Sequence, residues 1–405
     1  IVIFLFVIDI LSLKVRNANF SSLMKILHVI HTTNPQSGGP VEVLKQLFKH
    51  ENKNKIITEI LSSDNKIYSK NLKNDLPKIN TVGKQSFFFN YNSKLKIWLK
   101  KNINKYDLII VHGIWLYHNF AVMNVAKKFN KPYFVFMHGA MNPWLNKFLT
   151  FKYLKKKIFY FFFQKKFLLN ARSVLFTTHD EMENAKKEFD LSGVKKKNIG
   201  YGILGNQSFK EFEKKKFLLK FSQFRGKKIL LYLGRIHEIK GLDILIKSFL
   251  NMYKNNNNYH LVIAGPSSKK YLKYLKSLTN EGEKNITWLK DVYGQKKWDL
   301  FNVCDFFCQP SHNESFGITI VEALSSKKPV IISNKVNIYK TIKKYKAGFV
   351  VNDNQKSFDK IFKKIDSISD KSYNKLSKYA YKCFINEFQS EKYFNRYFRY
   401  IKLNR

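Results

Sequence analysis

The sequence predicts an α/β fold of two doubly wound domains that face each other, each built on a parallel sheet. The chain has 405 residues, which is too long for one ordinary hydrophobic core. From Met24 onward, short apolar runs alternate with longer amphipathic runs, as strands and their covering helices do. Hydrophobic residues make up 44% of the chain and aromatic residues 16%, which is enough for two cores and argues against disorder.

The first half is predicted as one domain over residues 24–203. Its strand-like runs are 25–31, 106–113, 132–139 and 171–180. A loop that contains Gly38 and Gly39 follows the first run and leads into a helical pattern at 41–50. Between the last two strands, residues 151–169 combine Lys pairs with Phe, Tyr and Leu and predict a basic aromatic helix.

The second half is predicted to follow a linker over residues 204–226, which are rich in Lys and Phe and show no clear strand. Its domain is expected over 227–372, with a helix at 240–253. Its strand-like runs are 227–236, 259–266, 285–292, 305–311 and 328–333. Residues 373–405 have helical periodicity and predict C-terminal helices.

The first 23 residues are set apart from this pattern. Residues 1–13 are almost wholly apolar but too short to span a bilayer, and Asp9 interrupts them. Met24 begins a run that is typical of a natural start followed at once by a strand. We expect residues 1–23 to be an over-extended reading frame, with a short apolar anchor or a signal peptide as alternatives.

The charge of the chain is strongly positive, at +44 from 73 Lys and Arg against 29 Asp and Glu. Only 7 of the basic residues are Arg, whereas nucleic-acid readers favour Arg. We therefore expect compositional drift to be the main cause, with affinity for an anionic membrane left open and no nucleic-acid partner. The cysteines, Cys304, Cys308 and Cys383, offer no disulfide framework, which indicates a reducing compartment. Cys304 and Cys308 fall in a strand-like segment and are expected to be core residues.

Two carboxylates in the second half mark a candidate anion site. Glu314 and Glu322 stand eight positions apart, and Phe316 and Gly317 lie in a turn between them that opens into a helical pattern. The start of a helix presents unpaired N–H groups and the positive end of its dipole. This place suits an anion with hydroxyl groups on either side, such as a nucleotide-diphosphate sugar.

Two cations are predicted to lie at the carboxyl end of the same sheet. A strand at 230–234 delivers Arg235 and, five residues later, Lys240. Two cations at such a place can clamp a diphosphate and neutralise the charge that grows as it leaves. Taken singly, Glu314 is equally consistent with an exposed loop carboxylate and Glu322 with a helix-face charge or cap, and solvated loop charges are the alternative for Arg235 and Lys240. Their combination in one doubly wound domain predicts a ligand site.

Residues 233–249, followed by 310–331, resemble the donor-binding half of the family-4 retaining glycosyltransferases, which have the GT-B fold of two Rossmann-like domains. Residues 111–144 are similar to the subgroup that builds bacterial surface polysaccharides, lipopolysaccharide among them. The resemblance covers about residues 24 to 400 and implies a C-terminal helix that returns toward the first domain. Two positions depart from the family pattern, since Lys290 stands where a Gly is usual and Tyr201 precedes Gly202.

The resemblance implies a role for each matching position. Arg235 and Lys240 would contact the donor diphosphate, and Glu322 would hold the ribose hydroxyls. Glu314 would lie near the hydroxyls of the transferred sugar. The remaining donor-binding groups would be the backbone N–H groups of Phe316, Gly317 and Ile318 and the loop glycines Gly38 and Gly39. His138 would face the reacting centre, with a structural strand-end histidine as the alternative interpretation, and His112 is a weaker candidate.

The implied activity is transfer of a hexose to a lipid-linked or growing surface polysaccharide, with retention of configuration and without a protein nucleophile. The chain has no Asp-x-Asp motif, which fits metal independence, and the donor nucleotide sugar is the only small molecule expected, with no cofactor. We expect a cytoplasmic enzyme, peripheral on the inner face of the membrane. The alternatives are a non-hydrolysing sugar-nucleotide epimerase of the same fold and a polybasic membrane or nucleic-acid binding protein.

The predicted helix at 151–169 has two interpretations. Its aromatic residues can pack the helix onto the first domain, or they can form a surface that rests on anionic lipid. The sequence does not separate these two interpretations.

Overall fold

The computed structural model describes residues 23–37, 39–54, 56–65, 76–83, 86, 89–142, 151–207, 214–253, 258–279 and 284–405. Gly38 lies outside the described residues, as do residues 1–22 of the N-terminal segment. No described helix is long and apolar enough to cross a membrane.

The first sheet has seven strands in the order β3-β2-β1-β4-β5-β6-β7. The strands are β1 (Lys25–Ile30), β2 (Ile57–Ser62), β3 (Lys78–Thr81), β4 (Leu108–His112), β5 (Tyr133–Phe136), β6 (Ser173–Phe176) and β7 (Lys196–Asn198). The pairings with a described register are all parallel. The sequence did not predict β2 and β3, because polar residues interrupt both. In β2 the buried Thr58 hydroxyl donates to the Glu51 carboxylate at 2.7 Å. This tertiary hydrogen bond satisfies a polar residue that interrupts the apolar pattern of the strand.

The second sheet has six strands in the order β10-β9-β8-β11-β12-β13. They are β8 (Lys228–Leu233), β9 (Tyr259–Ala264), β10 (Ile286–Leu289), β11 (Phe306–Gln309), β12 (Val330–Ser333) and β13 (Gly348–Val351), and their described pairings are parallel. The prediction of two parallel-sheet α/β halves is therefore confirmed. Strand β13 was not predicted.

Most helices lie between strands, as expected for crossover connections, and the last three follow β13. They are α2 (Gly39–Lys53), α4 (Ser93–Asn102), α5 (Tyr117–Lys128), α6 (Phe151–Phe159), a π-helical segment (Tyr160–Gln164), α7 (Lys165–Leu169), α8 (His179–Glu188), α9 (Lys214–Lys220), α10 (Leu242–Tyr253), α11 (Lys269–Ser277), α12 (Gln295–Val303), α13 (Ile318–Ser325), α14 (Tyr339–Tyr345), α15 (Gln355–Asp366), α16 (Asp370–Cys383) and α17 (Ser390–Leu403). The sequence marks the starts of several helices. The side chains of Asn92, Thr178 and Ser268 each accept a backbone N–H group from the first turn of the helix that follows.

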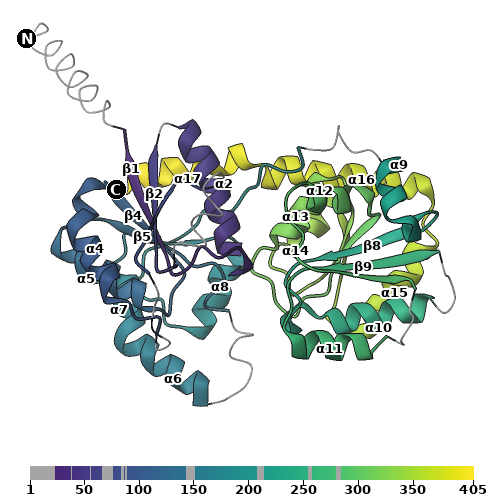
Figure 1. Ribbon diagram of the computed structural model, residues 1–405, viewed down its shortest axis with the longest axis horizontal. Coiled ribbons are helices and arrows are strands. Elements are labelled where there is room, and N and C mark those ends of the chain that lie inside the picture. The colour runs from purple at the N-terminus through teal and green to yellow at the C-terminus, as the bar shows by residue number, and fades with distance from the viewer. Residues whose placement is uncertain are drawn as a thin grey trace, which may run out of the picture. The chain divides into compact units, whose positions relative to one another are not determined.

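The second sheet is covered by helices on both faces. Figure 1 shows α10 and α11 on one face and α12 and α13 on the other. Strand β9 is buried along its whole length, which explains why the central strands read as continuous apolar runs. Cys304 and Cys308 are free and buried, as the sequence predicted, and Cys383 is also free and buried.

The chain divides into two compact units. Among the described residues, one unit holds those up to Asn34 together with Val43–Phe134, and the other holds Pro35–Glu42 together with Val135–Asn404. Within the second unit, α17 packs beside β6, where the Tyr400 hydroxyl donates to the Ser173 hydroxyl at 2.9 Å. The expected return of the C-terminal helix to first-half residues is therefore confirmed.

Candidate functional site

Lys240 and Glu314 form an ion pair in the second unit, although 74 positions separate them. Lys240 ends a short 3-10 turn (Glu238–Lys240) that follows β8, and Glu314 lies in the loop between β11 and α13. The backbone joins these loops, because the His312 N–H donates to the Ile239 carbonyl at 2.8 Å. Both side chains are mostly buried, at 16% and 18% exposure, so their interaction is less screened than that of a surface pair.

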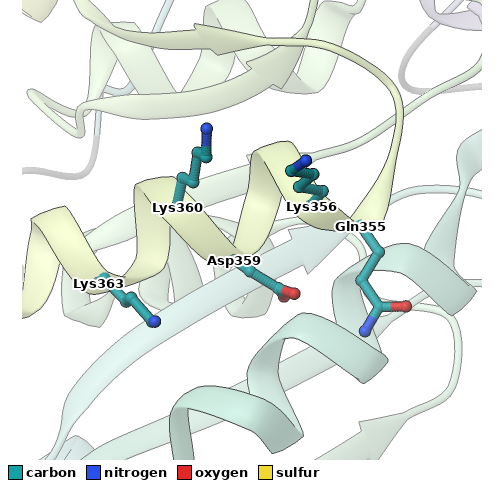
Figure 2. Close-up of a pocket in the computed structure, with 5 residues that line it drawn as sticks. All are labelled: Gln355, Lys356, Asp359, Lys360 and Lys363. Atoms are coloured by element: carbon teal, nitrogen blue, oxygen red, sulfur yellow. The ribbon is translucent and has the colours of Figure 1, made fainter.

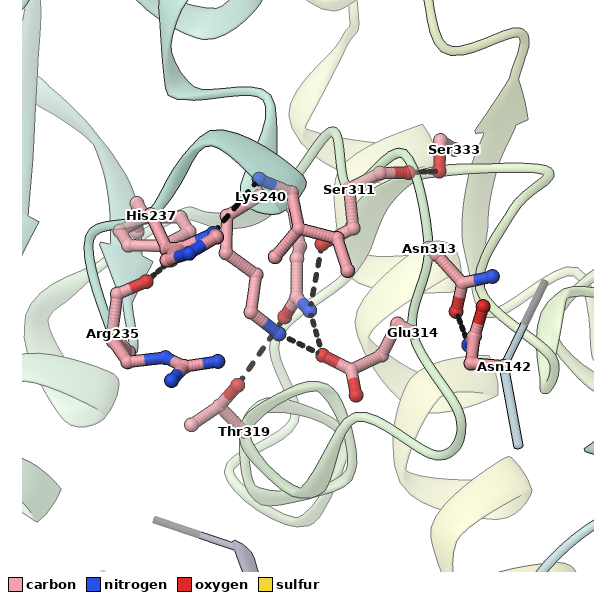
Figure 3. Close-up of polar contacts among 12 residues, drawn as sticks. Asn142, Arg235, His237, Lys240, Ser311, Asn313, Glu314, Thr319 and Ser333 are labelled. Atoms are coloured by element: carbon pink, nitrogen blue, oxygen red, sulfur yellow. Dashed lines mark hydrogen bonds and ion pairs between the residues drawn. The ribbon is translucent and has the colours of Figure 1, made fainter. Parts of the chain in front are cut away.

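Gln309, the last residue of β11, holds this ion pair in place. Its side-chain amide donates to the Glu314 carboxylate at 2.8 Å and to the Ser311 hydroxyl at 3.2 Å. Its carbonyl oxygen accepts the Thr319 hydroxyl at 3.3 Å, so the network reaches the first turn of α13 (Figure 3). The Glu314 carboxylate is thereby fixed between a cation and an amide.

Helix α13 begins beside Glu314, at Ile318. Its N-cap residue is Gly317, which has a φ of +82° and supplies no side-chain cap. Phe316 and Gly317 are buried, and Ile318 is half-buried. The first turn of α13 therefore keeps the donor groups and dipole that the sequence predicted at this place.

We expect Gly317→Ala to destabilise the fold and disturb the site. A Cβ at this position would lie 2.6 Å from the Ile320 Cδ1 atom and 3.3 Å from the Glu314 Cγ atom. The left-handed backbone alone costs a non-glycine residue about 1–2 kcal/mol, and crowding typically adds roughly 1–3 kcal/mol. Thermal and chemical unfolding measure the sum.

Gly226→Ala is the matched control for this substitution. Gly226 also has a left-handed backbone, with a φ of +70°, but its added Cβ would meet nothing within 4 Å. It should show the backbone cost alone. Equal losses in the two variants would contradict the inferred crowding at Gly317.

Arg235 lies near this cluster but its side chain is exposed. Its backbone carbonyl accepts the Tyr232 hydroxyl at 2.8 Å, and Figure 3 shows its guanidinium on the same side as Lys240 and Glu314. Burial lowers the pKa of His237, Arg235 and Lys240 lower it further, and Glu238 opposes them. Within the described part of the chain, no ion pair of Arg235 is found.

Glu322 lies on the buried side of α13 and pairs with Lys297 of α12. The Lys297 Nζ atom lies 2.5 Å from the Glu322 Oε1 atom, and the Glu322 side chain is only 5% exposed. Burial opposes the charge of Lys297, yet the Glu322 and Glu42 carboxylates raise its pKa, so we treat the pair as ionised. Burial also raises the pKa of Glu322, and Lys297 opposes that rise.

His138 follows β5 with a strained φ of +50°. Its ring stacks on Phe136 with centroids 4.9 Å apart, and burial lowers its pKa, so the imidazole is neutral near pH 7. The next residue, Gly139, approaches the Glu314 loop within the second unit, because a Cβ there would lie 2.1 Å from the Ser315 Oγ atom. The structure thus brings the turn after β5 to the loop that carries Glu314.

Glu181 fixes this turn, and sequence reasoning did not select it. Its buried carboxylate accepts the Gly139 N–H at 2.7 Å, the Thr177 N–H at 2.8 Å and the Thr177 hydroxyl at 2.6 Å. The available signal was the Thr-x-x-Glu pattern of Thr178 and Glu181, which is typical of a helix start. That pattern identifies the start of α8 but not a contact 42 positions away.

His112 has partners in the first unit that suggest a structural role. At the end of β4 its Nε2 atom lies 2.8 Å from the Nδ1 atom of His28, and the other ring nitrogen of His28 lies 3.2 Å from the Glu51 carboxylate. All three residues are buried. These buried contacts are typical of a structural histidine, and a catalytic role for His112 stays a weak prediction.

The two loop glycines complete the predicted set. Gly39 is exposed, begins α2 and belongs to the second unit, while Gly38 lies outside the described residues. Tyr201, the departure noted above, packs its ring edge-on against Phe316 at 5.1 Å and is buried. This ring contact supports the turn before α13.

A separate hollow on α15 is not part of this site. Figure 2 shows that its lining side chains all come from that one helix; they are Gln355, Lys356, Asp359, Lys360 and Lys363. None of them was predicted as a site residue.

In the part of the chain that the structure describes, no group of His, Cys, Asp and Glu could hold a metal ion.

Comparison with known proteins supports the resemblance that the two motifs predicted. Residues 213–383 match the model of the family described as "Glycosyl transferases group 1". The capsular polysaccharide biosynthesis glycosyltransferase CapM of Staphylococcus aureus is 27% identical over 202 residues, which cover 47% of this chain and 51% of CapM. The spore coat protein SA of Bacillus subtilis is 26% identical over 164 residues, 38% of this chain and 43% of that protein. These matches span about half the length of the relatives.

Solved structures show the same fold over nearly the whole chain. The structure of HepE of Anabaena in complex with UDP and glucose has a TM-score of 0.76, at 16% identity, over 94% of this chain and 99% of HepE. At this identity the likeness establishes the fold alone. The predicted GT-B fold is confirmed by it.

Proposed function

We propose that the chain is a retaining, metal-independent glycosyltransferase, because residues 213–383 match the model of the glycosyltransferase group 1 family. It transfers a hexose from a nucleotide-diphosphate sugar to a lipid-linked or growing surface polysaccharide. The name of CapM supports the polysaccharide product, and the UDP and glucose bound to HepE support the donor class. The reaction takes place at the inner face of the cytoplasmic membrane.

The ion pair between Lys240 and Glu314 at the start of α13 is the observation that carries this proposal. A donor diphosphate placed there would contact Lys240, Arg235 and the N–H groups of the first turn of α13. Glu314, held by Gln309, would accept hydrogen bonds from the sugar hydroxyls. Lys240, the cation, and Glu314, the hydrogen-bond acceptor for the sugar hydroxyls, thus lie next to each other. A donor in which the phosphate is bonded to the sugar requires this arrangement.

The chemistry of this arrangement is positional and electrostatic. As the bond between the sugar and the phosphate breaks, negative charge develops on the diphosphate, and Lys240 and Arg235 stabilise it. The leaving phosphate oxygen takes the proton of the acceptor hydroxyl on the same face of the sugar, so configuration is retained. A neutral His138 can donate or accept a hydrogen bond at the reacting centre without adding charge. Glu322 holds the ribose.

A screen of UDP-, GDP- and ADP-sugars tests the proposal. One class of donor should raise the melting temperature of the protein by mass action. With a lipid-linked glycan acceptor present, that donor should yield a product whose new linkage keeps the anomeric configuration, read by NMR, with or without EDTA.

Two outcomes would contradict the proposal. Conversion of the sugar in the absence of acceptor would indicate the epimerase alternative. Salt-sensitive binding to nucleic acid or lipid, with no effect of any nucleotide sugar, would indicate a polybasic binding protein.

A further inference from the structure

The helical run over α6, the π-helical segment and α7 has an outer face that is apolar. Phe151 is 73% exposed, Phe161 is 70% exposed and Phe162 is 64% exposed. The other large apolar side chains exposed on this run are Leu154, Ile158, Phe163 and Leu169. A helix on a protein surface normally turns its apolar stripe inward and its polar residues outward. The exposed apolar outer face of this run departs from that rule and therefore requires an explanation.

The inner face of the same run is already used for packing. Tyr160, Phe167 and Leu168 are buried, and the Tyr160 ring lies 4.7 Å from the Phe189 ring. Lys165 forms an ion pair with Asp190. The run is therefore anchored to the first half by one set of aromatic residues, while a second set points away from it. The packing interpretation of the predicted helix at 151–169 is therefore confirmed for its inner face, and contact of the outer face with lipid stays a prediction.

The spacing of the exposed residues makes one continuous surface. Phe151, Leu154, Ile158 and Phe161 recur at intervals of three and four, so they lie along one side of the helix. The π-helical segment (Tyr160–Gln164) adds one residue per turn there, and three consecutive Phe side chains, 161–163, are exposed as a result. We call residues 151–163 of this face the aromatic ridge.

The charged residues of the chain segment that carries the aromatic ridge are all basic. The sequence contains no Asp or Glu from Leu108 to His179, and this stretch holds ten Lys and Arg172. Lys155 is exposed and places its Nζ atom 4.6 Å from the centre of the Phe151 ring. A second copy of the ridge would bring like charges together, whereas an anionic surface would pair with them. Exposed aromatic rings beside lysines suit the boundary between lipid headgroups and acyl chains.

We propose that the aromatic ridge docks on a bilayer containing anionic phospholipid, with its Phe, Leu and Ile side chains inserted between headgroups. The ridge lies on the bilayer and does not cross it, consistent with the lack of a spanning helix among the described residues. This inference deepens the proposed function, on which it rests, because a lipid-linked acceptor would lie in the same bilayer. It assigns the membrane contact to α6 and the π-helical segment.

Co-sedimentation with vesicles tests the docking. The probe is phosphatidylcholine vesicles with and without phosphatidylglycerol, and the test variant is Phe151→Ser, Phe161→Ser and Phe162→Ser combined. The full chain should bind the mixed vesicles, and bind neutral ones more weakly. The triple variant should bind mixed vesicles at least about tenfold more weakly, since each inserted ring contributes apolar burial.

A matched triple variant controls for general loss of surface hydrophobicity. Leu219→Ser, Tyr274→Ser and Leu403→Ser combined removes three exposed apolar side chains from other helices. It should bind vesicles as the unaltered chain does. Circular dichroism and thermal unfolding of both triple variants establish that each is folded.

Three outcomes would overturn the docking proposal. The ridge variant could bind mixed vesicles with unchanged affinity, the control variant could lose affinity equally, or the unaltered chain could form dimers that only the ridge variant breaks. A measurement of donor binding distinguishes a failure of the docking proposal from a failure of the proposed function. A protein that binds vesicles through the ridge but no nucleotide sugar would leave the docking intact and refute the proposed function.

Discussion

Lys240→Met is expected to reduce glycosyl transfer by about 10²–10³-fold, the loss typical when one preorganised stabiliser of developing charge is removed. Methionine keeps the length of the side chain and removes its charge. The Glu314 carboxylate loses its cation but keeps the Gln309 amide at 2.8 Å, so the loop has a remaining anchor. The effect should appear mainly in kcat, because the charge on the diphosphate grows in the transition state.

The matched control for this variant is Lys269→Met. Lys269 is exposed at the start of α11, in the same half of the chain, and contacts none of the predicted site residues in the described structure. It should transfer sugar at the unaltered rate. If the Lys240 variant is folded and retains full activity, Lys240 does not stabilise the leaving group and the site assignment is wrong.

Glu322→Gln is expected to weaken donor binding and also to destabilise the fold. A hydrogen bond from a ribose hydroxyl to a carboxylate contributes roughly 1.5–3 kcal/mol, so the donor Kd should rise by about tenfold to a hundredfold. The substitution also leaves the mostly buried Lys297 charge without its 2.5 Å partner. Breaking one side of a buried pair typically costs about 3–5 kcal/mol of unfolding free energy.

A double variant separates these two effects. Lys297→Met combined with Glu322→Gln removes both charges, and stability should recover because no buried charge is left unpaired. Donor affinity should stay low, since the ribose still lacks its carboxylate. Calorimetry gives both quantities, and Lys296→Met, an exposed neighbour on α12, serves as the control. Recovery of donor affinity in the double variant would show that Glu322 acts only as the partner of Lys297.

The order of most elements, and the closeness of Lys240 and Glu314, could be predicted from local sequence. The central strands β8 and β9 are continuous apolar runs because helices cover both faces of their sheet. Four charged residues were recognised as candidate site residues because their residue types recur at the ends of such strands and at a helix start. They are Arg235, Lys240, Glu314 and Glu322. Strands β2 and β3 were missed because their polar residues find partners elsewhere in the fold, as Thr58 does at Glu51.

The sequence by itself therefore determined that this chain has two parallel-sheet halves with GT-B topology and a clustered set of cations and carboxylates in the second half. Only the tertiary structure decided which partner each group has. Lys297 pairs with Glu322, Gln309 holds Glu314, and Glu181 fixes the turn after His138. The same holds for the side chains of α6, since only the packing around Tyr160 shows which rings point outward. The physical reason is that hydrophobic period and turn chemistry act between near neighbours in the chain, whereas hydrogen bonds and ion pairs join residues that folding alone brings together.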